Sequence, residues 1–251
     1  MRSASLPVLQ QSDVPVSIYV SNNAKTGFSI NTPIDKTCRP TEACSRYCYG
    51  NYGPISFANA TNRQNENYRR FGFLATASPR ELAQEAERVY NRVYPERDYL
   101  RMFGVGDLTE GSVRFINALA KRYPKFAIWV ATRRIDLARK LVNTANLHIM
   151  VSIDETTKGD DFHKTWEFVQ ARAPQAFGAY VQQREDEAVP PWVKVIFVQH
   201  GPGGHRKAWS AEHKDARMCP VTVADGPEHD DACNRCRYCF NVKKRQSGRI
   251  G

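Results

Sequence analysis

Short apolar runs alternate with longer amphipathic segments across the middle of the chain. The apolar runs predict five strands, at residues 99–103, 127–130, 147–151, 177–181 and 193–198. Between them, apolar residues recur at helical spacing, as in Val113, Ile116 and Leu119. Strands alternating with helices of about 10–15 residues predict βαβ units joined in a parallel sheet. We therefore expect an α/β fold, arranged as a partial or complete parallel βα barrel rather than as a long open sheet.

The first hundred residues carry weaker patterns. Residues 16–20 alternate as a single short strand within an irregular arm. Residues 36–56 form a loop rich in Cys, Pro, Gly and Tyr, and a helix is expected near residues 57–70. Ser78 and Glu81 then predict a capping box at the start of the next helix, because each side chain can bond the backbone N–H of the other residue.

These patterns divide the chain into three parts. Residues 1–35 are expected to be an N-terminal arm with the first strand, and residues 36–200 a βα-repeat core that carries the first cysteine loop. Residues 201–251 are expected to be a cysteine-rich, metal-binding extension with a basic tail. The tail at residues 243–249 has the composition of a solvated, disordered terminus.

Polar residues follow the predicted strands. The carboxyl ends of parallel strands lie at one edge of a sheet, and binding sites on such folds are built there. A single polar residue at a strand end can be explained as a helix cap, but several together predict a functional site. The residues concerned are Asp107, Thr132, Arg133, Ser152, Asp154, Gln199 and His200.

Composition adds a basic charge balance. The chain has 36 Lys and Arg against 26 Asp and Glu, for a formal net charge of +10. This excess indicates either a solvated basic surface or an anionic partner, of which nucleic acid is the simplest. Apolar runs stay well short of the roughly 18 residues that a membrane helix needs, and the first residues lack the apolar stretch of a secretory signal. We therefore expect a cytoplasmic protein with no membrane partner.

The C-terminal cysteines have the spacing of a metal site. Cys233, Cys236 and Cys239 form a Cys-x2-Cys-x2-Cys run, and Cys219, followed by proline, lies upstream. Ferredoxin-type 4Fe-4S clusters use the same short run and a distant cysteine followed by proline. Zinc is the alternative, although four-cysteine zinc sites normally use two Cys-x2-Cys pairs. Seven cysteines in total also exclude complete pairing as disulfides within one chain.

A second group of cysteines lies near the N-terminus. Cys38, Cys44 and Cys48 form a Cys-x5-Cys-x3-Cys pattern in a turn-rich loop. Three thiolates would leave one iron of a four-iron cluster without a protein ligand, and an open metal position is what catalysis requires. The alternative is one mixed site, in which an N-terminal cysteine joins the C-terminal group around a single metal.

These features resemble the radical S-adenosylmethionine superfamily. They are closer still to bacteriophage gene-product families of unassigned function that are related to spore photoproduct lyase. The resemblance covers roughly residues 25–240, and the N-terminal loop departs from the superfamily's usual Cys-x3-Cys-x2-Cys spacing. It is carried by Tyr47-Cys48-Tyr49-Gly50, Gly106-Asp107-Leu108, Trp129-Val130-Ala131-Thr132-Arg133-Arg134, Val151-Ser152-Ile153-Asp154 and the C-terminal cysteines.

The resemblance implies a radical enzyme that uses a 4Fe-4S cluster and S-adenosylmethionine. Cys38, Cys44 and Cys48 would hold the cluster, and Asp107 and Asp154 would be the catalytic residues. Asp107 would hold the amine of the cofactor, and Ser152 or Asp154 its ribose. The full cofactor-binding set implied is Gly104, Gly106, Asp107, Thr132, Ser152 and Asp154.

Two functions remain open. One is a radical enzyme acting on a nucleotide, a nucleic acid or another anionic substrate, in the host cytoplasm if the chain is phage-encoded. The other is a non-enzymatic iron–sulfur or zinc protein that binds nucleic acid or a host protein on an inherited βα scaffold. The altered spacing of the N-terminal loop favours the second function more than any other feature does, since fold alone does not establish activity.

Overall fold

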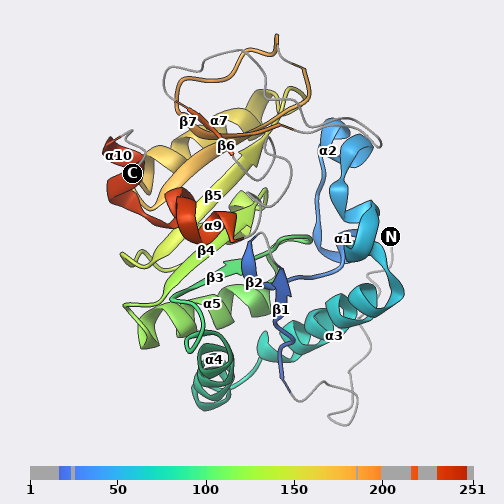
Figure 1. Cartoon of the computed structure of the whole chain (residues 1–251), viewed down its shortest axis with the longest axis vertical. Helices are drawn as coiled ribbons and strands as arrows, with labels where there is room; N and C mark the ends of the chain where they lie inside the picture. Colours follow the sequence, from blue (N-terminus) through green and yellow to red (C-terminus); the bar gives the residue numbers. More distant parts are fainter. Residues whose placement is uncertain (1–16, 24–25, 185, 199–215, 220–230, 248–251) are drawn as a thin grey trace.

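The computed structural model describes residues 17–23, 26–184, 186–198, 216–219 and 231–247 (Figure 1). Within these residues, one sheet has the strand order β1 to β8, and every neighbouring pair is parallel except β1 and β2. The strands are β1 (Ser21–Asn23), β2 (Gly27–Ile30), β3 (Tyr99–Met102), β4 (Ala127–Thr132), β5 (Leu147–Ile153), β6 (Ala176–Gln182), β7 (Val193–Val198) and β8 (Arg217–Met218).

The expected α/β class is confirmed, and the sheet is open. In the described part of the chain, β1 and β8 are its two edges and do not pair with each other. The sheet joins strands from all three expected parts of the chain. β2, from residues 1–35, pairs with β3, and β8, from residues 201–251, pairs with β7. The helices are α1 (Ile34–Thr37), α2 (Glu42–Tyr47), α3 (Ala58–Leu74), α4 (Pro79–Val93), α5 (Glu110–Arg122), α6 (Ile135–Ala138), α7 (Gly159–Ala171), α9 (Ala232–Cys236) and α10 (Val242–Ser247), with 3-10 turns at Tyr49–Asn51, Gly53–Ser56 and Tyr238–Phe240.

The two faces of the sheet are covered by different parts of the chain. Successive strand residues point to opposite faces. On one face, residues such as Leu100 and Ile128 join the main core with α3, α4 and α5. On the other face, Tyr99 and Trp129 join a second apolar cluster with Tyr238 and Phe240. Figure 1 shows this arrangement, with the red C-terminal helices lying against the sheet across β3 to β5. The second face therefore carries the C-terminal cysteine segment.

The predicted helices are largely confirmed. The capping box of α4 is present, with the Ser78 backbone N–H donating to the Glu81 carboxylate at 2.7 Å and the Glu81 N–H donating to the Ser78 hydroxyl at 3.3 Å. The helix that follows β4 is short and ends at Ala138. Beyond it, the Asn117 side chain accepts from the Val142 N–H at 2.8 Å, and this bond takes the place of a helical one.

The strand expected at residues 16–20 is wrong. Val16 lies outside the described residues, and the sheet begins at β1. The backbone before β1 bonds to helix side chains: the Ile18 N–H donates to the Glu85 carboxylate at 2.6 Å, and the Tyr19 N–H to the Asn67 amide oxygen at 2.7 Å. The apolar alternation correctly placed Ile18 in the main core, but residues 17–20 are not part of a strand in the described structure.

The tail expected to be solvated and disordered instead forms a helix as far as Ser247. This helix, α10, holds Arg245 with only 8% of its surface exposed. The end of the expected tail, beyond residue 247, lies outside the described residues. No helix in the described part of the chain is both long enough and apolar enough to cross a membrane.

Candidate functional site

The N-terminal cysteine loop begins where β2 ends. Cys38 follows α1, Cys44 lies inside α2, and Cys48 ends α2. Because β2 is parallel to β3, this loop lies at the carboxyl edge of the parallel strands. Burial, followed by the charges of Asp107, Cys44 and Cys48, raises the pKa of the Cys38 thiol to about 12. The structure therefore brings the three cysteines together on the side of the sheet where the strand-end residues lie.

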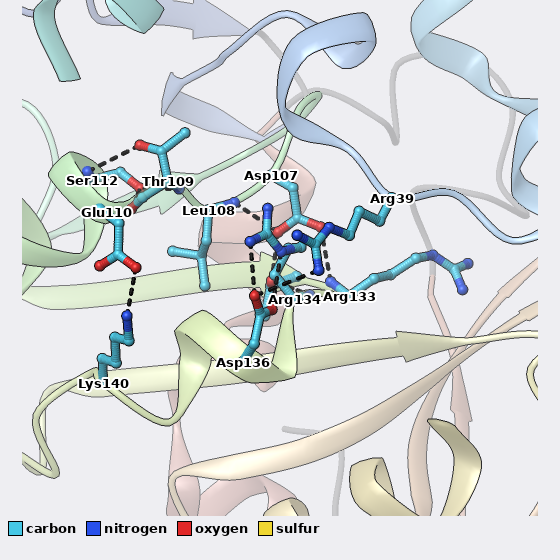
Figure 2. Close-up of polar contacts among 11 residues, drawn as sticks. Arg39, Asp107, Leu108, Thr109, Glu110, Ser112, Arg133, Arg134, Asp136 and Lys140 are labelled. Atoms are coloured by element: carbon cyan, nitrogen blue, oxygen red, sulfur yellow. Dashed lines mark hydrogen bonds and ion pairs between the residues drawn. The ribbon is translucent and has the colours of Figure 1, made fainter. Parts of the chain in front are cut away.

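Asp107 joins the end of β3 to the end of β4 and to the cysteine loop. Its carboxylate accepts from the Thr132 hydroxyl at 2.5 Å and from the backbone N–H groups of Leu108 and Arg133 at 2.7 and 3.0 Å. Its own N–H donates to the Thr37 hydroxyl, next to Cys38, at 3.0 Å. Figure 2 shows the Asp107 carboxylate beside Leu108 and Arg133. Burial raises the pKa of Asp107 despite these hydrogen bonds.

Asp154 makes the corresponding connection from the end of β5. Its carboxylate accepts from the hydroxyl of Thr41 at 2.5 Å and from the hydroxyl of Thr156 at 2.7 Å. The Thr41 hydroxyl also caps α2 by accepting from the Cys44 N–H at 3.2 Å. Burial alone would raise the pKa of Asp154, but the Arg133 charge and the two threonine hydroxyls outweigh it and lower the pKa. Asp154 is thus ionised and bonded to the residue that caps the cysteine helix.

Arg133 connects the two carboxylates. Its backbone N–H bonds to Asp107, and its guanidinium lies 2.9 Å from the Asp154 carboxylate. Burial raises the pKa of the Cys44 thiol, and the charge and hydrogen bond of Arg133 act in the opposite direction. The sequence placed Arg133 at a strand end but did not include it among the cofactor-binding residues. Because Arg133 lies between the ends of β4 and β5, it contacts both Asp107 and Asp154.

The glycines expected to bind cofactor have a packing role. Gly106 has a φ of +83°, and a Cβ there would lie 2.1 Å from the Thr32 hydroxyl oxygen. A Cβ on Gly104 would lie 2.8 Å from the Asn31 side-chain oxygen. Both glycines therefore allow the β3–α5 loop to approach the β2–α1 loop closely. Their contact with a cofactor stays a prediction, as does that of Ser152, which is half-buried on β5.

An outer layer of charge surrounds the same edge. Arg39, in the cysteine loop, lies 3.6 Å from the Asp136 carboxylate on α6, and Arg134 lies 2.8 Å from the same carboxylate. Figure 2 shows both arginines converging on Asp136. The expected strand-end residues Gln199 and His200 lie outside the described residues. The cysteine loop is thus bonded to the ends of β3, β4 and β5.

The C-terminal cysteines also gather. Cys219 follows β8, Cys233 and Cys236 lie in α9, Cys239 lies in the 3-10 turn after it, and all four pack against the second apolar cluster. Burial, followed by the charges of Cys219, Cys233 and Cys236, raises the pKa of Cys239 well above its ordinary value. Burial also raises the pKa of Cys233 to about 11. Among the described residues, no group of three or more His, Cys, Asp or Glu side chains is arranged so that it could hold a metal ion.

A family model described as gene product 88 matches residues 9–242. The chain belongs to the gene product 88 family. The match spans all seven cysteines and confirms the expected relation to phage-type gene products of unassigned function. It shows no link to the radical S-adenosylmethionine superfamily or to spore photoproduct lyase. No curated protein and no solved structure matches the chain.

In this gene product 88 chain, a buried arginine lies beside the C-terminal cysteines. The Arg245 guanidinium donates to the carbonyl oxygens of Tyr238, Cys239 and Pro174 at 3.2, 2.7 and 2.8 Å. It also lies 3.4 Å from His148 Nδ1. Burial lowers the pKa of Arg245 to about 10, and burial together with the Arg245 charge lowers that of His148 to about 3. No sequence pattern predicts this arrangement, because Arg245 stands in a run of basic and polar residues.

Arg101 and Trp129 lie on the same face of the sheet. They are register partners on β3 and β4, and the Arg101 guanidinium lies 4.8 Å from the centre of the Trp129 ring. The Trp129 Nε1 and Arg101 Nε atoms are buried and have no hydrogen-bond acceptor in the described structure. The Arg101 charge acts on Cys233, and the side chain also hydrogen bonds to Tyr49, which follows Cys48. Arg101 therefore lies between the two cysteine groups.

Proposed function

We propose that this protein is an iron–sulfur enzyme of the radical S-adenosylmethionine type. Cys38, Cys44 and Cys48 would hold a 4Fe-4S cluster at the carboxyl edge of the sheet. The observation that carries the proposal is the connection of this loop to the strand ends, through Asp107 on one side and Asp154 on the other. A cysteine loop tied to the ends of successive parallel strands has the position that α/β folds use for ligands.

The donor set fits such a cluster. Thiolates are the ligands that iron–sulfur clusters use, and three of them from one loop leave one iron open. When bound, the cluster and S-adenosylmethionine supply one-electron cleavage of the sulfonium and a carbon radical that takes hydrogen from the substrate. Among the described residues the sheet is open, with helices covering its first face and the C-terminal segment its second, so the proposal rests on the strand ends and not on closure into a barrel. The hydrogen-bonded loop would keep the three sulfurs in position.

The protein's own residues would bind and orient the cluster and the cofactor. Asp154, ionised and bonded to Thr41, holds the start of the cysteine helix against β5. Asp107 fixes the β3 end against Thr132 and is our candidate for the cofactor amine. Arg133 keeps a positive charge beside Cys44, where thiolate ligation would place negative charge. These contacts restrain the loop, and a restrained site loses less entropy when a ligand binds.

The substrate would be a nucleotide, a nucleic acid or another anionic molecule. Arg39, with 71% of its side chain exposed, stands at the edge of the site. The chain as a whole has a formal net charge of +10, which also favours anionic ligands. Positive charge near a binding site concentrates anionic ligands and speeds their association. This basic edge supports an acidic substrate class more directly than composition alone does.

A non-enzymatic iron–sulfur or zinc protein is the second candidate. Two observations favour it: the x5 and x3 spacing of the loop, and the engagement of the Asp107 carboxylate in three hydrogen bonds within the protein. Such a protein would use the same cysteines to stabilise a surface for nucleic acid or a host protein.

Anaerobic reconstitution separates the two functions. Full-length protein would be loaded with iron and sulfide, assayed for both, and reduced in the presence of S-adenosylmethionine. The enzyme proposal expects 5′-deoxyadenosine from the parent and from Ser45→Ala, a neighbouring exposed control, but none from Cys44→Ser. An assembled cluster that does not cleave S-adenosylmethionine supports the non-enzymatic function. Colourless protein with stoichiometric zinc and no sulfide would overturn both iron–sulfur versions.

A further inference from the structure

Arg245 is a buried charge without an opposite charge in the described structure. Its hydrogen-bond partners in the described residues are three carbonyl oxygens and one imidazole nitrogen. Carbonyl groups satisfy its hydrogen bonds but supply no net negative charge. A buried guanidinium normally requires a carboxylate or another anion, because the loss of hydration is costly. Its position next to Cys239 therefore calls for a source of negative charge on the same face of the sheet.

The four C-terminal cysteines can supply that charge. Arg245 bonds directly to the carbonyl oxygen of Cys239, and the Cys239 thiol interacts with Cys219, Cys233 and Cys236. Thiols are neutral, but metal ligation converts them to thiolates. Four thiolates around zinc, or around a 4Fe-4S cluster, keep a net negative charge. Either metal centre would therefore provide the anion that Arg245 lacks.

Two further donors point to the same conclusion. Trp129 is 2% exposed and belongs to the apolar cluster against which the four cysteines pack. Its Nε1–H has no acceptor in the described structure, and the same is true of Arg101 Nε. Buried donors are rarely left unpaired. Sulfur anions of a bound centre would be acceptors within this cluster, and hydrogen bonds of this kind are common around metal thiolates.

We propose that Cys219, Cys233, Cys236 and Cys239 hold an anionic tetrathiolate metal centre for which Arg245 is the buried counter-charge. Trp129 and Arg101 donate N–H groups to its sulfurs. Arg245 acts through the cysteines and is a positioning residue. This centre is separate from the N-terminal site, so that either proposal can fail while the other stands.

The test isolates the C-terminal group in the full-length chain. Cys38, Cys44 and Cys48 are replaced by Ser, and Co²⁺ is titrated under anaerobic conditions, with sulfur-to-cobalt charge-transfer absorption as the readout. Arg245→Gln keeps a donor but removes the charge, whereas Arg245→Lys keeps the charge. Lys243→Gln removes one charge from an exposed position of the same helix and is the matched control.

Loss of the counter-charge should lower Co²⁺ affinity by roughly 10–100-fold in Arg245→Gln, the usual range for groups just outside a metal site. Arg245→Lys and Lys243→Gln should stay close to the parent. Arg245→Gln loses the carbonyl contacts in the metal-free and the metal-loaded protein alike. That loss therefore does not change the difference in free energy between the two forms, which sets the Co²⁺ affinity. An unchanged affinity in Arg245→Gln, or an equal loss in Arg245→Lys, would mean that Arg245 only packs the helix and would overturn the proposal.

Trp129→Phe gives a second, independent measurement. It removes the Nε1–H together with part of the buried indole, so some packing stability is lost with or without metal, and the melting temperature of the metal-free variant is measured as the reference for that loss. The loaded protein should lose metal to a chelator faster than the parent. Parallel loading with Zn²⁺ and with iron plus sulfide identifies which metal binds. Failure of Co²⁺, Zn²⁺ and iron with sulfide to bind the parent background, or equal metal loss from Trp129→Phe and parent, would contradict the assignment.

Discussion

Arg133 and Asp154 form an ion pair of 2.9 Å between the ends of β4 and β5, with 14% and 0% of their side chains exposed. The pair is more than a link between strands, because Asp154 also bonds to the residue that caps the cysteine helix. Breaking a buried pair by removing one partner leaves an uncompensated charge. The stability of the fold and the position of Cys44 are therefore coupled at this point.

Arg133→Met should destabilise the protein by about 3 kcal/mol, since it leaves the Asp154 carboxylate buried and unpaired. Arg134→Met is the matched control: its partner Asp136 is 51% exposed, and an exposed pair contributes only about 0–1 kcal/mol. Urea unfolding monitored by tryptophan fluorescence measures both variants. Equal midpoints for the two variants would show that the Arg133 pair is no more important than the surface pair.

A second buried pair lies far from both cysteine groups. The Glu85 side chain is fully buried, bonds to Arg70 at 2.5 Å and accepts from the Ile18 N–H at 2.6 Å. Glu85→Gln should cost about 3 kcal/mol, because it leaves the Arg70 charge without its partner. Glu87→Gln, two residues later on the exposed side of the same helix, should change stability by less than about 1 kcal/mol. Denaturant titration of both variants checks the difference, and metal content should be unaffected in each.

Backbone geometry at Gly106 predicts a third effect. Gly106→Ala should destabilise the protein by at least about 1–3 kcal/mol, because the residue has positive φ and its Cβ would clash with Thr32. Gly72→Ala is the control in the last turn of α3, where a Cβ would meet nothing within 4 Å. That change should stabilise the protein by about 0.5–1 kcal/mol. Thermal melting of the two variants should therefore shift in opposite directions, and a shift in the same direction would refute the packing role of Gly106.

The βα core was predictable because its signals are local. Strands β3 to β7 are apolar on both faces, and the helices between them keep a regular apolar spacing. By contrast, β2 is only four residues long and begins at Gly27, which has a positive φ. Its identity depends on pairing with β3, which lies about seventy residues away along the chain. A short strand with one distant partner leaves little trace in its own sequence.

The candidate site was partly predictable for the same reason. Asp107, Thr132 and Asp154 follow neighbouring parallel strands, so topology alone brings them to one edge. The role of Thr41 depends on where the cysteine loop folds back onto β5, and no sequence pattern encodes that contact. Arg245 was misjudged, because its run of basic residues is typical of a free terminus. Its burial depends on Pro174 and Phe177, which belong to a distant part of the fold.

The two cysteine groups should respond differently to the loss of one ligand. Cys44→Ser should remove the metal of the N-terminal loop while the βα core still folds, because that core is built on its own apolar contacts. Cys236→Ser should instead release the C-terminal segment, since α9 is only five residues long and the proposed metal would supply much of the free energy that holds it against the sheet. Iron and zinc content, thermal melting and limited proteolysis of α9 and α10 would be measured for both variants. We expect Cys236→Ser to expose α9 and α10 to protease, and Cys44→Ser to leave them protected. A third outcome, loss of metal from both groups in Cys44→Ser, is also tested, because Arg101 lies near both Tyr49 and Cys233. If Cys44→Ser empties both groups, the seven cysteines serve one mixed site, and the case for an open catalytic iron is lost.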